Sequence, residues 1–131
     1  MDRNTRRRFD TILEEVLDQL PQWIHDLIDE VPLHVEDYPS DELLHQMNIA
    51  HRGQLCGLYT GIPLTDRSIR QSGTMPDVVT IYREGVINAA ANAHGMVTDN
   101  RLRREIRITL LHELGHHHGL DEDDLRELGY G

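Results

Sequence analysis

The sequence is short of several residue types, and each shortage excludes a class of protein. It has one cysteine, Cys56, which excludes an intramolecular disulfide framework and a thiolate-rich zinc cluster. We interpret this thiol, which lies among apolar neighbours, as a buried structural group, and we expect the protein in the reducing cytoplasm. No apolar run approaches the roughly 20 residues that cross a bilayer, so we expect no membrane association.

Lysine is absent, and basic residues are outnumbered. All 13 are arginines, against 23 acidic residues, which gives a net charge of −10. Binding to nucleic acid requires a basic surface that neutralises phosphates, so the composition argues against a nucleic-acid partner. Arginines cluster at Arg6–Arg8 and between Arg101 and Arg107, but both clusters fall in expected helices with acidic neighbours. We interpret them as solvated helix faces.

Aromatic residues make up only 5% of the chain, and hydrophobic residues make up 38%. A chain of this length and composition can bury one modest core of leucine, isoleucine and valine. We therefore predict a single domain over residues 1–131. The basic stretch Met1–Arg8 is not followed by an apolar segment, which argues against a secretory signal.

Hydrophobic periodicity predicts helices mixed with short strands. Apolar residues at three- and four-residue spacing predict an amphipathic helix over Thr5–Leu20, and Pro21 ends it and opens a second helix. Because the elements do not alternate regularly, we predict an α+β fold. The other expected elements are helices at Ser40–Leu44, Glu84–Ala93, Thr98–His118 and Asp121–Leu128, strands at Val31–Glu36, Gln54–Thr60 and Val78–Tyr82, and a long loop between Gly61 and Asp77.

Two histidines in the expected helix at Thr98–His118 have the spacing of metal ligands. His112 and His116 are four residues apart, so their imidazoles project from one face about one turn apart and can hold one ion. Glu113 can take a proton from a metal-bound water and return it to a leaving amine. Because His-Glu-x-x-His on a helix is typical of zinc metalloproteases, we predict His112 and His116 as zinc ligands and Glu113 as general base.

The competing interpretation of this segment is a histidine-rich helix end. Imidazoles at a helix C-terminus interact favourably with the helix dipole, and we assign only that role to His117 and His118. The remaining histidines show no ligand spacing and are interpreted as ordinary surface or core residues: His25, His34, His45, His51 and His94.

The segment from His112 to Leu125, followed by Leu128–Tyr130, resembles the C-terminal signature of the bacterial minimal-zincin, or zincin-like metallopeptidase, family. Met75–Asp77 and Ile81–Arg83 are also similar to that family. The resemblance covers most of the chain and implies a compact α+β fold, in which a small mixed sheet packs against the motif helix. It further implies that the edge strand beside that helix pairs with an extended peptide substrate, and Val78–Tyr82 is our candidate for this strand.

The resemblance also implies a third zinc ligand. Family members usually carry an acid, often aspartate, at the eleventh position of the extended motif, and here that position holds Glu122. Gly119 is a helix stop signal, so the chain turns back where a third ligand is needed. We predict Glu122, with Asp121 and Asp123 as alternatives if the turn differs by one residue.

Three functions follow from these patterns. The leading hypothesis is a zinc-dependent metallopeptidase that acts on a peptide or protein substrate, with water at an open fourth metal position. The second is a non-catalytic zinc-binding module that meets a protein partner, which applies if the acids after Gly119 fill the fourth position. The third is an adaptor that holds no metal.

Overall fold

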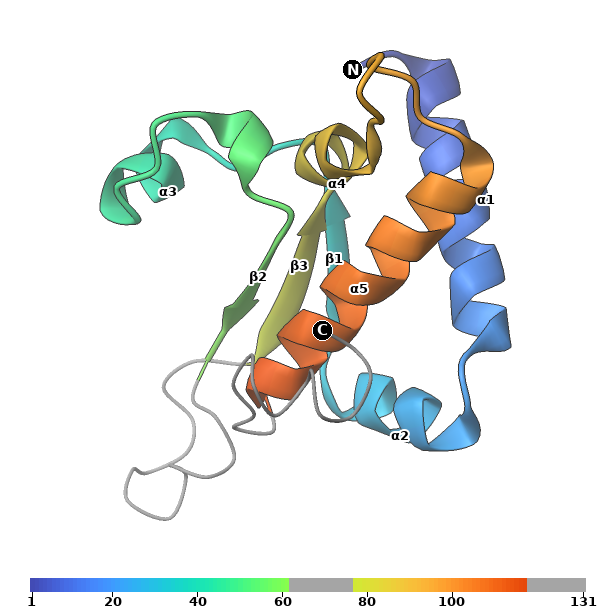
Figure 1. The fold of residues 1–131 in the computed structure, drawn as a ribbon. Helices are drawn as coiled ribbons and strands as arrows, with labels where there is room; N and C mark the ends of the chain where they lie inside the picture. Colours follow the sequence, from blue (N-terminus) through green and yellow to red (C-terminus); the bar gives the residue numbers. More distant parts are fainter. Residues whose placement is uncertain (62–76, 118–131) are drawn as a thin grey trace.

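The structure, a computed structural model, describes residues 1–61 and 77–117 (Figure 1). Helices and strands are mixed along the chain, as the predicted α+β class requires, and no helix within these ranges has both the length and the apolar composition to span a membrane. In chain order the elements are α1 (Arg3–Gln19), α2 (Gln22–Glu30), β1 (Leu33–Glu36), α3 (Asp41–Gln46), the 3-10 helix η1 (Arg52–Gln54), β2 (Gly57–Thr60), β3 (Val78–Tyr82), α4 (Arg83–Ala90) and α5 (Asp99–His117).

The strands form a small mixed sheet with β3 in the middle, in the order β1-β3-β2. β1 runs parallel to β3 and places Val35 opposite Ile81. β2 runs antiparallel to β3 and places Gly57 opposite the same residue, Ile81, on its other side. The mixed sheet that we predicted is therefore confirmed.

The prediction that Val78–Tyr82 is the edge strand is wrong, because β3 is hydrogen-bonded to a strand on each side. Its side chains are covered on both faces: Val79 and Ile81 are fully buried, and Thr80 and Tyr82 keep at most 9% exposure. A β-branched sequence reflects this burial and suits a central strand. The edge beside α5 is β2, which within the described residues pairs only with β3.

The core lies between the sheet and two helices, α1 and α5, that pack against each other (Figure 1). The stripes predicted on both helices are buried, and they consist of Phe9, Ile12, Leu13 and Val16 on α1 and of Leu102, Ile106, Leu110 and Leu114 on α5. Burying one such side chain contributes about 1.5–3 kcal/mol. The packing of these stripes therefore holds α5 in a fixed position against the sheet.

Side-chain hydrogen bonds satisfy backbone groups at some of the helix ends. The Ser40 hydroxyl caps α3 by accepting a hydrogen bond from Leu43 N at 3.1 Å, as predicted. α4 ends at Ala90, earlier than expected, and Arg101 donates hydrogen bonds to the free carbonyl oxygens of Ala90 at 2.6 Å and Ala91 at 3.2 Å. β2 begins at Gly57 and not at Gln54, because η1 occupies Arg52–Gln54.

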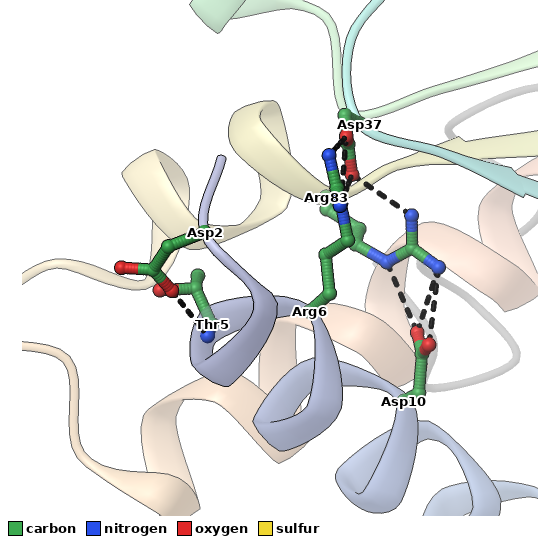
Figure 2. A network of polar contacts seen from close by, with 6 residues as sticks. All are labelled: Asp2, Thr5, Arg6, Asp10, Asp37 and Arg83. Atoms are coloured by element: carbon green, nitrogen blue, oxygen red, sulfur yellow. Dashed lines mark hydrogen bonds and ion pairs between the residues drawn. The ribbon is translucent and has the colours of Figure 1, made fainter.

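An ion-pair network joins α1 to the ends of β1 and β3 (Figure 2). The Arg83 guanidinium contacts Asp10 and Asp37 at 3.0 Å each, and Arg6 contacts Asp37 at 2.6 Å. Hydrogen bonds from Arg6, followed by those from Arg83, hold the pKa of Asp37 below its usual value, against the opposing effect of burial. Ile81–Arg83 was singled out in the sequence, and here its arginine has a structural role.

Candidate metal centre

Helix α5 positions the predicted site. The Thr98 hydroxyl accepts a hydrogen bond from Arg101 N at 3.2 Å, so Thr98 caps the helix that begins at Asp99. The helix continues without interruption to His117, which places His112, Glu113 and His116 in its last two turns. The apolar residues of α5 face the core, and the motif side chains lie at the end of the helix beside β2.

The three motif residues come together as the spacing predicts. Nitrogen atoms of His112 and His116 and a carboxylate oxygen of Glu113 all lie within 4.8 Å of one another. The two imidazole rings are 4.5 Å apart, centroid to centroid, and meet edge to face at 68°. Among the described residues, this group is the one whose donor atoms converge closely enough to hold a metal ion.

Glu113 is a carboxylic acid in an unusually buried position, with only 8% of the residue exposed. One of its oxygens, Oε2, lies 3.4 Å from Nδ1 of His116. Burying a carboxylate is costly unless a charge or hydrogen bond compensates it. Both histidines are half-buried, and the His116 side chain is 38% exposed, so a cation in solution can reach the group.

The donor set fits zinc. Zinc sites in proteins use imidazole nitrogen and carboxylate oxygen, and at Zn–N distances of about 2.0–2.1 Å two tetrahedral ligand atoms lie roughly 3.3 Å apart. The donor atoms of the observed group lie within 4.8 Å of one another, so a bound ion would draw them closer together. His112 and His116 could therefore hold the ion with Glu113 beside it.

A glycine that the sequence pattern did not reveal lets the strand approach the site. A Cβ on Gly57 of β2 would lie 2.9 Å from Thr109 Cγ2, 3.1 Å from Glu113 Cγ and 3.1 Å from the Thr80 carbonyl oxygen. A side chain there would push against α5 and β3, so glycine at position 57 lets β2 lie directly against α5. A glycine inside a predicted strand was the available signal, since such residues often mark a close backbone approach.

The edge strand β2 runs from this contact along the motif helix. Gly57 and Tyr59 project to the same side of the sheet as Ile81 and Val79, the side on which α5 lies. The end of the strand is tied to β3 by Tyr59, whose hydroxyl donates to Asp77 Oδ1 at 3.2 Å. The outer edge of β2 thus passes close to Glu113 with its backbone groups turned away from β3.

Cys56 precedes Gly57 and was predicted to be a structural thiol. Its Sγ is half-buried and donates a hydrogen bond to the Gly85 carbonyl oxygen at 3.4 Å. Burial, reinforced by the negative charges of Glu105 and Glu113, raises the pKa of this thiol above its usual value. A raised pKa keeps the group protonated, which agrees with a structural role and disfavours a nucleophilic one.

The predicted third ligand is not placed. Glu122 and its alternatives, Asp121 and Asp123, lie outside the described residues, as does the Gly119 turn.

Residues 28–131 match the model of a family described as zincin-like metallopeptidase. The match begins at the end of α2 and includes the sheet, β2 with Gly57 and the whole of α5; α1 precedes it. No curated protein matches the chain.

Proposed function

The chain belongs to the zincin-like metallopeptidase family, and on that premise we propose that it is a zinc-dependent peptidase. The observation that carries the proposal is the convergence of His112, Glu113 and His116 within 4.8 Å on α5. Convergence of two imidazoles with a buried carboxylate beside an edge strand is what metal-assisted hydrolysis of a peptide requires.

In this proposal the chain supplies the metal ligands from the end of α5. His112 and His116 hold the zinc, and Glu122 completes the three protein ligands that a catalytic site normally has. Zinc, when bound, polarises the peptide carbonyl and lowers the pKa of water. The burial of Leu110 and Leu114, on the core side of α5, fixes the helix backbone that carries the two histidines.

Glu113 acts as general base and acid. Its carboxylate lies beside the two imidazoles, takes a proton from the attacking water and returns it to the leaving amine. Its 8% exposure limits competition from bulk water for this proton. Its Oε2 lies 3.4 Å from Nδ1 of His116, which places the carboxylate next to the proposed ligands.

The substrate is a peptide or protein segment in extended conformation, and it pairs with the outer edge of β2. Backbone groups at a sheet edge bind an added strand through main-chain hydrogen bonds. Gly57 brings this edge to Glu113, so a peptide added there passes over the motif residues. The strand proposed to pair with the substrate is therefore Gly57–Thr60 and not Val78–Tyr82, which is the central strand.

The test compares wild type with Glu113→Gln on a broad peptide library, with and without added zinc. Glutamine keeps the size of the side chain but cannot accept the proton, so cleavage should fall by roughly two to four orders of magnitude while zinc binding persists. Glu105→Gln, which changes an acid two turns earlier on α5, is the control and should keep its activity. If zinc-loaded wild type cleaves no peptide, a non-catalytic zinc-binding module becomes the better account.

A further inference from the structure

A cavity of about 540 Å³ lies where the end of α1 and the start of α2 meet α5. Its floor is apolar and includes Val16, Leu20, Ile24 and Leu111, which are nearly fully buried. Its rim is basic, with Arg103, Arg104 and Arg107 from α5. The volume falls within the range of about 300–1,000 Å³ typical of sites for small molecules.

The basic rim of the cavity is set apart from the metal centre along α5. Arg103 and Arg107 come nine residues before His112 and His116, which is about two and a half helical turns and half a turn around the axis. Arg104 comes eight residues before His112, about two turns along the helix. The α1 side of the cavity also precedes residue 28, where the family match begins. It is thus separate from the site proposed above and does not depend on that proposal.

The rim is positively charged, whereas the chain as a whole is negatively charged. The protein carries −10 overall, yet no acidic residue is among the described residues that line the cavity. Arg103 donates hydrogen bonds to Glu15 Oε2 and to Asn100 Oδ1, both at 2.7 Å. Arg104 and Arg107 are exposed and form no ion pair with any other residue in the described ranges.

The arginines of the rim also repel one another. Arg103 and Arg107 are four residues apart on α5, and Arg104 and Arg107 are three apart, so each pair shares a helix face. Like charges at these spacings destabilise a helix. An anion held between Arg104 and Arg107 would relieve this repulsion and gain charge-assisted hydrogen bonds.

We propose that this cavity is a binding site for a small amphipathic organic anion. The acidic group, a carboxylate, phosphate or sulfonate, is bound by Arg104 and Arg107. The apolar body lies on the floor made by Leu20, Ile24 and Leu111. The amides of Gln19 and Asn100 at the cavity wall provide hydrogen bonds to polar substituents.

The probe for the test is 8-anilinonaphthalene-1-sulfonate, which joins an aromatic body to a sulfonate. Trp23, the single tryptophan, is adjacent to Ile24 in sequence, so its fluorescence reports binding by energy transfer. Folded wild type should bind one probe per chain, with an affinity that falls as salt is added. Arg104→Gln with Arg107→Gln should weaken binding by about tenfold or more, because two charged hydrogen-bond donors are lost.

The matched control is Arg3→Gln with Arg7→Gln, which removes the same charge from exposed positions on α1. This variant should bind within about twofold of wild type. The neutral analogue N-phenyl-1-naphthylamine should bind all three proteins alike. Circular dichroism checks that each protein is folded. Equal weakening in both double variants, unchanged binding in R104Q/R107Q, or no saturable binding by wild type would overturn the proposal.

Discussion

Gly57 of β2 lies against Glu113 of α5 so closely that a Cβ on the glycine would be 3.1 Å from Glu113 Cγ. The same atom would be 2.9 Å from Thr109 Cγ2, one helical turn before Glu113. The proposed general base and the proposed substrate-binding edge can therefore lie this close because position 57 has no side chain.

Gly57→Ala should separate the strand from the helix. Overpacking of this kind costs about 1–3 kcal/mol of unfolding free energy. A displaced Glu113 should also lower kcat, so that kcat/KM falls by more than the change in KM. Urea denaturation and peptidase kinetics measure the two effects. Thr109→Ser removes the Cγ2 methyl but keeps the hydroxyl, so G57A/T109S should recover part of the lost stability. If Gly57→Ala behaves like wild type, β2 and α5 are not in this contact.

Metal binding should depend on both histidines of the motif. Wild type purified without chelator or affinity tag should contain about one zinc per chain, and His112→Ala or His116→Ala should each abolish it, because one imidazole leaves too few ligands. Elemental analysis and chelator competition measure this. His94→Ala, at an exposed position outside the group, is the control. Wild-type zinc content in both motif variants would exclude the proposed centre.

The third ligand can be located by comparing neighbours in the acidic segment. Glu122→Gln should weaken zinc binding more than Asp121→Asn or Asp123→Asn, since each change removes one carboxylate at equal size. Zinc affinities measured side by side for the three variants decide the register of the turn. A larger loss in Asp121→Asn or Asp123→Asn would move the ligand to that residue.

The ion pairs of Asp37 should stabilise the fold only at pH values at which its carboxyl group is ionised. Because Arg6 and Arg83 hold its folded pKa below the unfolded value of about 3.9, the contribution is fully present above pH 4 and disappears as the pH falls through the folded value. Asp37→Asn should therefore lower the free energy of unfolding by about 1–2 kcal/mol near pH 7, a value between those typical of exposed and of buried ion pairs. The loss should become progressively smaller below about pH 4.

Unfolding free energies from urea titrations at a series of pH values test this expectation. Asp18→Asn, which changes an exposed acid on α1, is the control and should show a small, nearly constant difference from wild type. A penalty for Asp37→Asn that stays constant down to pH 3 would mean that the carboxylate charge is not what stabilises the network.

The sequence by itself determined the features that arise between near neighbours in the chain. Apolar periodicity over Thr5–Leu20 and Thr98–His118 predicted α1 and α5 with their buried stripes, because helix faces repeat every 3.6 residues. The four-residue spacing of His112 and His116 predicted that their imidazoles meet on one face, and they do. Short-range geometry is enough for each of these results.

Tertiary structure alone decided how distant segments meet. The β-branched sequence of Val78–Tyr82 predicted a strand but not its central place, because burial on both faces depends on which strands and helices cover it. The approach of Gly57 to Glu113, and the cavity between the α1–α2 junction and α5, join residues more than 50 positions apart. Side-chain patterns repeat within an element, whereas the order of strands and the fit of one element on another depend on the packing of the whole core.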